Sequence, residues 1–141
     1  MAKGLFEAKV RAAGLSGEIH IDSAGTSSYH VGERPDPGSI EVAARVGIDI
    51  REDRSRQFVS ADFDRFDYLI AMDRSNQQNM ARLRPSESSR VTLIRSYGGP
   101  DDSLDVPDPW GGGIGGFERV YEILDAATAG LLAQIREEHG L

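Results

Sequence analysis

The segment from Asp105 to Trp110 presents the carboxylate of Asp108 in a stiff loop. Prolines at positions 107 and 109 flank Asp108. Pro109 disfavours the α conformation at Asp108, and neither proline can donate a hydrogen bond to a strand ladder. Trp110 follows directly, and glycines occupy positions 111, 112, 113, 115 and 116. A rigid carboxylate, a large aromatic and a pliant glycine run suit the rim of an active site. A proline-bounded turn with an exposed aspartate is the simpler interpretation of the same local pattern.

Small polar residues and arginines form two more candidate sites. Ser23-Ala24-Gly25-Thr26 leaves a predicted strand, and strand-end loops of α/β sheets lie on the side where ligands bind. A simple turn explains the same residues. Arginines at positions 51, 54 and 56 could form an anion site, although such a run is more often a solvated face.

Histidine and cysteine usage limits the metal and redox chemistry. His20, His30 and His139 show no metal-ligand spacing, so we interpret all three as structural or surface residues. Cysteine is absent, which removes disulfides, thiolate metal sites and a cysteine nucleophile from this sequence. We therefore predict no metal and no other cofactor.

Size and composition favour one globular domain over residues 1–141. The chain is 39% hydrophobic and 28% charged, as is usual for a soluble protein. A net charge of −7 argues against a nucleic-acid or anionic-membrane partner. No apolar run approaches a membrane span, and nothing at the amino terminus resembles a signal peptide. We expect a cytoplasmic location.

Helical and strand patterns alternate along the chain. Apolar spacing and capping residues predict helices over 2–13, from Asp36-Pro37 to Gly47, over 60–66, from Asp73 over 74–84, and over 117–138. Strands are predicted at 18–22, 68–72 and 91–94, the second as a continuous apolar run typical of a strand buried on both faces. Such alternation implies an α/β fold, a doubly wound parallel sheet with helices on both faces.

The chain resembles the low-molecular-weight protein tyrosine phosphatases in motifs that span nearly all of its length. In order they are Ile21-Asp22-Ser23-Ala24-Gly25-Thr26, Val31-Gly32, Pro35-Asp36-Pro37, Arg56-Gln57, Phe66-Asp67-Tyr68, Ala71-Met72-Asp73-Arg74-Ser75-Asn76, Val106-Pro107-Asp108-Pro109-Trp110 and Phe117-Glu118-x-Val120-Tyr121. Their order and spacing are those of the family. The resemblance implies the family's three-layer fold and hydrolysis of phosphate monoesters on tyrosine or a similar group.

The resemblance also implies roles for single residues. Asp108 matches the acid that protonates the leaving phenolate and then activates water on a cysteinyl-phosphate. Trp110 and Tyr29 match aromatic walls against the substrate ring, and Ser23 matches a serine that braces the phosphate-binding loop. The substrate would be a phosphorylated protein or a small aryl phosphate. Phosphate is bound by arginine and backbone amides, so the resemblance implies no metal.

One part of the family pattern has no match in this sequence. Family members open with a hydrophobic strand and a C-x5-R phosphate-binding loop, and the residues from Met1 onward resemble those just after that loop. We expect the first strand, the nucleophilic cysteine and the clamping arginine to be lacking, so the chain as written should not turn over substrate. The absent strand belongs between 19–22 and 68–72. Its absence would expose strand edges that could pair with another chain, for instance in a homodimer.

Three explanations for the missing motif are open at this point. One explanation is a start codon that is assigned too late. The chain could also be a true truncation that serves as a non-catalytic binding or dimerisation module. Finally, the chain could be a different α/β protein. Met72-Asp73 after a buried strand resembles the phosphoacceptor site of signal-receiver domains, but these also need an acidic pair near the start and a late lysine, and no lysine follows Lys9. An arsenate reductase on the same fold requires cysteines, and the sequence has none.

Overall fold

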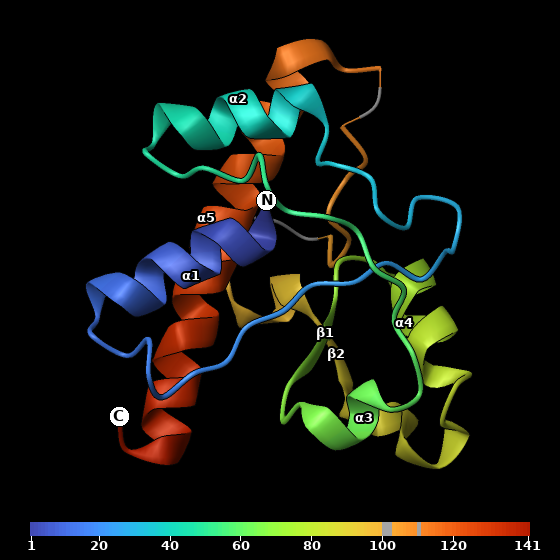
Figure 1. Cartoon of the computed structure of the whole chain (residues 1–141). Helices are drawn as coiled ribbons and strands as arrows, with labels where there is room; N and C mark the ends of the chain where they lie inside the picture. Colours follow the sequence, from blue (N-terminus) through green and yellow to red (C-terminus); the bar gives the residue numbers. More distant parts are fainter. Residues whose placement is uncertain (100–102, 110) are drawn as a thin grey trace.

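A computed structural model of the chain describes residues 1–99, 103–109 and 111–141. Its α-helices are α1 (Ala2–Ala12), α2 (Pro37–Arg45), α3 (Asp62–Arg65), α4 (Arg74–Ala81) and α5 (Gly113–His139), its strands are β1 (Leu69–Ala71) and β2 (Val91–Leu93), and its 3₁₀ helices are η1 (Pro85–Arg90) and η2 (Ile94–Tyr97). Helices α1, α2 and α5 lie on one side of the strands, and α3 and α4 lie on the other (Figure 1). The predicted layers, helix over sheet over helix, are confirmed.

The sheet is small and parallel. β1 pairs with β2 in a register that sets Leu69 opposite Val91 and Ala71 opposite Leu93. The strand predicted at 18–22 is wrong as a strand: this segment follows an open path beside the sheet, and the nearest ladder contact is an isolated parallel bridge between Gly25 and Gln57. A strand exists only where a neighbour hydrogen-bonds to its edge. Within the described part of the chain, no such neighbour lies beside 18–22.

Two hydrophobic clusters fill the layers on either side of the sheet. The first joins α1, α5 and Ile94, and the second joins Phe63, β1, β2 and Met80. Side chains alternate between the faces of a strand. Accordingly, Ile70 packs against the first cluster, whereas its neighbours Leu69 and Ala71 belong to the second.

Helix starts follow local sequence signals. Asp73 caps α4, since its Oδ1 accepts a hydrogen bond from the Asn76 N–H at 2.7 Å, as predicted. Asp36 occupies the same position before α2, where Pro37 opens the helix, but its side chain makes no capping bond. Helix α5 starts at Gly113, earlier than the predicted residue 117. Gly116 permits this start, because a Cβ there would lie 2.9 Å from the Pro109 carbonyl oxygen.

Two glycines let helices approach their neighbours closely. A Cβ placed on Gly130 would overlap the carbonyl oxygen of Tyr97, so this position of α5 lies against η2. A Cβ on Gly38 would overlap the ring of Phe117, which joins α2 to α5. Neither site has room for a side chain.

Candidate active site

The loop that carries Asp108 is fastened to the carboxyl end of β1. Val106 donates its N–H to the Met72 carbonyl at 2.9 Å. Arg74 donates its N–H to Asp105 Oδ1 at 2.9 Å and its Nε–H to the same oxygen at 3.3 Å. The largely buried Arg95 donates to the Asp105 carbonyl at 2.6 Å. These contacts fix the residues just before Asp108 at the edge of the sheet where ligands bind in α/β folds.

Charge also favours this arrangement of the loop. The backbone N–H of Arg74, followed by its guanidinium, lowers the pKa of Asp105 below its ordinary value. Asp105 is therefore an anion held by donors from α4 and is not itself a proton donor. Asp108, three residues on, is exposed to solvent. Its exposure to solvent is compatible with the predicted role in proton transfer.

Of the two predicted aromatic walls, only Tyr29 lies within the described residues. Tyr29 is 90% exposed, in a turn where its N–H donates to Ser27 Oγ at 3.1 Å. Trp110 lies outside the described residues. The pairing of these two rings around a substrate stays a prediction.

The Ser23–Thr26 segment reaches the same edge of the sheet. Gly25 accepts from the Phe58 N–H at 2.7 Å and donates to the Arg56 carbonyl at 2.8 Å. Asn76 Nδ2 of α4 donates to Thr26 Oγ1 at 3.4 Å. The predicted strand-end loop is thus held near α4, although no strand precedes it.

Arg56 forms a salt bridge with Asp62 and Asp22 that supports this segment and that the sequence did not indicate. Arg56 donates to both oxygens of Asp62, at 3.0 and 3.1 Å, and its Nε donates to Asp22 Oδ2 at 2.9 Å. Asp62 has no exposed surface, and it also accepts the Val59 N–H at 2.8 Å. Burial opposes ionisation of Asp62, but the bonds from Arg56 and Val59 outweigh it and lower its pKa.

The contacts of Arg51, Arg54 and Arg56 decide between an anion site and a solvated face. The hydrogen bond to Asp62 raises the pKa of Arg56 above its ordinary value. Arg51 pairs with Asp49, and Arg54 donates to backbone carbonyls. All three guanidinium groups have partners within the protein. This favours a solvated, internally paired face over an anion site.

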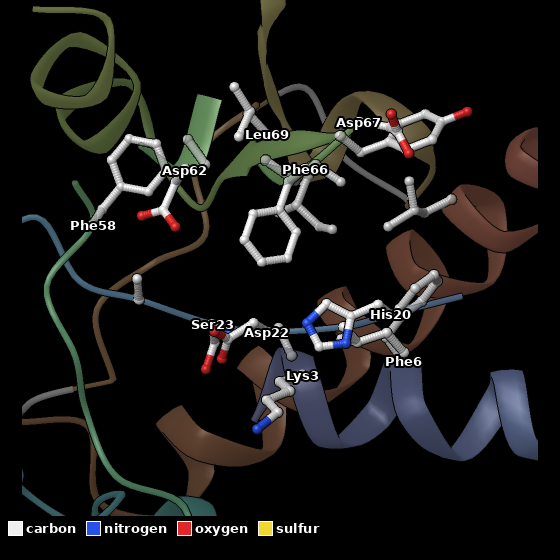
Figure 2. Close-up of a pocket in the computed structure, with 18 of the residues that line it drawn as sticks. Lys3, Phe6, His20, Asp22, Ser23, Phe58, Asp62, Phe66, Asp67 and Leu69 are labelled. Carbon is white, nitrogen blue, oxygen red and sulfur yellow. The ribbon is translucent and has the colours of Figure 1, made fainter. Parts of the chain in front are cut away.

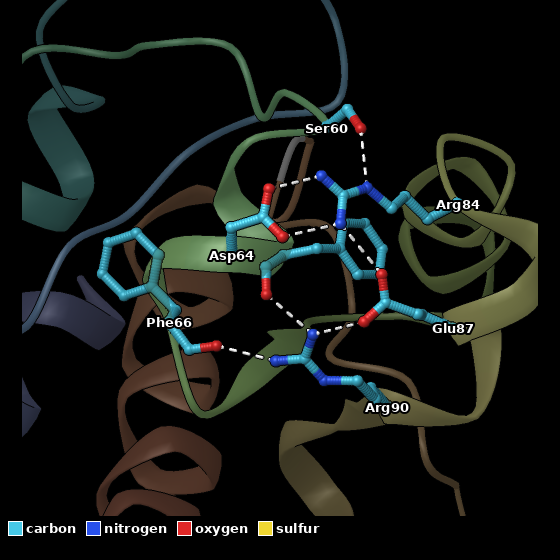
Figure 3. Close-up of polar contacts among 7 residues, drawn as sticks. Ser60, Asp64, Phe66, Arg84, Glu87 and Arg90 are labelled. Carbon is cyan, nitrogen blue, oxygen red and sulfur yellow. Dashed lines mark hydrogen bonds and ion pairs between the residues drawn. The ribbon is translucent and has the colours of Figure 1, made fainter.

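A second polar network fastens α3 to η1 (Figure 3). Arg84 donates to Ser60 Oγ at 3.0 Å, to Asp64 at 2.8 and 2.5 Å, and to Glu87 at 3.0 Å. Arg90 shares Glu87 at 2.9 Å and donates to two backbone carbonyls of 63–66 at 2.7 and 2.8 Å. The hydrogen bonds from Arg84 and Arg90 lower the pKa of Glu87. Residues 60–66, which include Asp62, are therefore held on the β1–β2 unit.

A cavity of about 590 Å³ lies between the 18–26 segment and β1 (Figure 2). Ser23 lines it, whereas Tyr29 and Asp108 do not. The structure therefore places Ser23 at a hollow beside the sheet and Asp108 on a separate, anchored loop. His20 also lines the cavity, with its ring 5.7 Å from that of Phe66.

The described ranges were also searched for metal ligands and membrane spans. Within residues 1–99, 103–109 and 111–141, no three His, Asp or Glu side chains gather closely enough to hold a metal ion. In those ranges, no helix combines the length and apolar character needed to cross a membrane.

Comparison with known proteins identifies the family. The family model described as "Low molecular weight phosphotyrosine protein phosphatase" matches residues 1–140. The chain belongs to this family. It is 42% identical to a low molecular weight protein-tyrosine-phosphatase of Streptomyces coelicolor over 98% of this chain and 86% of that protein. It is 42% identical to a Schizosaccharomyces pombe low molecular weight phosphotyrosine protein phosphatase over 86% of this chain and 78% of that protein.

Solved structures agree with the family assignment. The crystal structure of YfkJ from Bacillus subtilis has a TM-score of 0.90 and 34% identity, over 98% of this chain and 86% of that one. A protein tyrosine phosphatase from Entamoeba histolytica, crystallised with Hepes in its active site, has a TM-score of 0.89 and 32% identity, over 99% of this chain and 89% of that one. The predicted α/β phosphatase fold is confirmed.

Proposed function

We propose that this chain provides the proton donor and the substrate rim of a phosphate monoester hydrolase that acts on phosphotyrosine or a similar group. Family membership supports the reaction class, and the anchored Asp105–Asp108 loop supports Asp108 as the proton donor. In the complete enzyme a thiolate attacks phosphorus, and the bond to the phenolic oxygen breaks as Asp108 gives that oxygen its proton. Asp108 then takes a proton from the water that hydrolyses the cysteinyl-phosphate and releases inorganic phosphate.

The chain as written should bind or orient substrate without turning it over. Its sequence contains no cysteine, and none of the motifs described above supplies another nucleophile. Tyr29 is 90% exposed, and we assign it contact with the substrate ring because it matches an aromatic wall of the family. No metal or organic cofactor takes part in the proposed reaction.

The test uses two proteins and one chromogenic aryl phosphate. The first is the present chain, for which we expect no turnover. The second carries an apolar strand and a C-x5-R loop ahead of Met1, and we expect it to hydrolyse the ester. In this extended protein, Asp108→Asn should lower kcat by about 10²–10⁴-fold, the usual contribution of a positioned acid. Asp36→Asn, an exposed aspartate away from the loop, is the matched control. Equal turnover by the Asp108→Asn variant and its parent would refute the assigned role.

The lack of cysteine favours a second candidate, a non-catalytic binding module. A phosphotyrosine peptide immobilised on resin distinguishes the two functions. Retention of the present chain by that peptide, together with an inactive extended protein, would support the module. An active extended protein would support the hydrolase.

A further inference from the structure

One buried arginine contacts the loop that carries Asp108. Arg95 is 8% exposed, and its Nη1 donates to the Asp105 carbonyl oxygen at 2.6 Å. Among the residues that the structure describes, it is the only buried arginine or lysine. Moving a charged side chain out of water costs free energy, so a buried arginine implies contacts that offset this cost.

The Asp105–Val106 peptide group is hydrogen-bonded at both of its ends. Its carbonyl oxygen accepts from Arg95, and its N–H, which belongs to Val106, donates to the Met72 carbonyl at 2.9 Å. A peptide group is planar and rigid, so one bond at each end fixes the direction of the whole plane. The bonds from Arg74 hold the Asp105 side chain instead of this plane.

Prolines limit how far Asp108 can move once that plane is fixed. The ring of Pro107 locks its own φ, and a residue that precedes a proline is restricted to extended conformations. Val106 precedes Pro107 in this way, and Asp108 precedes Pro109. Between the fixed plane and the Cα of Asp108, the ψ angle of Pro107 is therefore the least restricted dihedral. The direction of the Asp105–Val106 plane largely sets where Asp108 lies.

The base of the Arg95 side chain is held by close packing. Arg95 belongs to η2, whose first residue, Ile94, is buried in the first hydrophobic cluster. The hydroxyls of Tyr97 and Thr92 form a hydrogen bond of 2.8 Å, which ties η2 to β2. Gly130 of α5 lies against the Tyr97 carbonyl without room for a side chain. These contacts fix η2 between β2 and α5, so the guanidinium of Arg95 is presented from a rigid base.

We propose that Arg95 is a positioning residue for proton transfer, which fixes the Asp105–Val106 peptide plane and, through Pro107, the place of Asp108. Helix α5 and η2 thereby hold the proton donor against the carboxyl end of β1. Arg95 acts through the loop and not by contact with the substrate. The inference rests on the proposed function, because it takes Asp108 as the acid.

Amide hydrogen exchange tests the contact in the chain as it stands. Arg95→Met removes the donor and keeps most of the length of the side chain. Relative to the amides of β1, the Val106 N–H should exchange about tenfold to hundredfold faster, the factor that corresponds to one lost charge-assisted hydrogen bond. Arg95→Lys keeps a charged donor on a shorter side chain without the planar fork, so it should accelerate the same amide by only about threefold to tenfold.

Arg90→Met is the matched control for exchange. Arg90 also donates to backbone carbonyls, but within the network that joins α3 to η1. Its loss should leave exchange at Val106 unchanged relative to β1. An equal relative rate at Val106 in Arg95→Met and Arg90→Met would overturn the proposal. If Arg95→Met fails to fold, Arg95→Lys decides, and a relative rate equal to that of the parent would overturn the proposal.

Kinetics with two aryl phosphates test whether the contact serves proton transfer. The protein is the extended one, with an apolar strand and a C-x5-R loop ahead of Met1. Phenyl phosphate releases a basic phenolate that needs a proton, whereas 4-nitrophenyl phosphate releases a stabilised phenolate that needs it far less. Arg95→Met should lower kcat/KM by about tenfold for phenyl phosphate and by less than about threefold for the nitro ester. Arg90→Met should leave the ratio of the two values unchanged.

Asp108→Asn separates failure of this inference from failure of the proposed function. The acid is already absent in that background, so Arg95→Met should lower kcat/KM for phenyl phosphate by less than about twofold more. A full further loss would overturn the inference and leave the role of Asp108 intact, as would equal losses for the two esters in Arg95→Met alone. Turnover of phenyl phosphate by Asp108→Asn at the rate of its parent would overturn the proposed function and this inference together.

Discussion

The salt bridge between Arg56 and Asp62 makes the sharpest prediction for stability. The change is Arg56→Met, which keeps most of the length of the side chain and removes its charge. Asp62 would then keep the Val59 N–H but lose both bonds from the guanidinium, with no surface exposed to water. Removal of one partner from a buried ion pair strands the other charge and costs about 3–5 kcal/mol.

The expected loss lies at the low end of that range. The Arg56 side chain is 34% exposed, so water and relaxation of the loop will compensate Asp62 in part. We expect the free energy of unfolding to fall by about 3 kcal/mol, a large fraction of the roughly 5–15 kcal/mol typical of a domain. Urea titration followed by circular dichroism measures this change at constant m-value.

Two further variants show whether the stranded charge is the cause. Asp62→Asn in the Arg56→Met background keeps an acceptor for Val59 and removes the charge, so the double variant should be more stable than Arg56→Met alone. Arg51→Met breaks an exposed pair with Asp49 and should have no resolvable effect. Equal losses for Arg56→Met and Arg51→Met, or a double variant less stable than Arg56→Met, would refute the reasoning.

Acid titration gives an independent check with a definite sign. The pKa of Asp62 is lowered in the folded state, so its stabilising contribution is complete above the unfolded value of about 3.9 and is lost as the pH falls through the folded value. In Arg56→Met, burial without the guanidinium favours the protonated form. The difference in stability between the parent and the variant should therefore shrink as the pH falls from 7 towards 4.

Three other predictions test caps, packing and ionisation. Asp73→Ala should cost about 1 kcal/mol of unfolding free energy and Asp36→Ala clearly less, since only the first makes a capping bond. Gly130→Ala should lower the free energy of unfolding by roughly 1–3 kcal/mol, because its Cβ would meet the Tyr97 carbonyl. Gly115→Ala has open space at its Cβ and should raise it by up to about 1 kcal/mol. Similar losses for the two variants would contradict the close contact between Gly130 and Tyr97. Burial, aided by a hydrogen bond to Glu138, raises the pKa of Tyr68 to about 12. The free energy of unfolding should therefore fall as the pH rises from about 10 to 12, when followed in spectroscopic titrations. Tyr68→Phe should remove this loss of stability.

Local signals in the sequence predicted the parts of the fold that depend on neighbouring residues. The cap at Asp73 lies three residues from the N–H that it accepts, and the apolar stripe of α5 follows helical spacing. Both interactions are complete within a short stretch of sequence. The strand at 18–22 was predicted from a valid alternation of apolar and polar residues, but a strand also needs a bonded neighbour, which no local pattern guarantees.

The candidate site was only partly predictable for the same reason. The two prolines indicated a stiff loop around Asp108, but not that Arg74 and Arg95 fasten it through Asp105, because those partners lie 31 and 10 residues away. Likewise, Arg56 meets Asp22 across 34 residues. Side-chain pairs of this separation depend on the folded path of the chain and leave no mark on sequence periodicity.

The alternation of β1 between two hydrophobic clusters limits which changes in chain length the protein can tolerate. Deletion of one residue from β1 would turn Ile70 towards Met80 and turn its neighbours towards α5, so that both clusters would receive side chains of the wrong size at once. The side chains of the exposed stretch 27–34 do not alternate between two clusters in this way. Homologous sequences should therefore vary in length around Tyr29 and keep a constant length through β1.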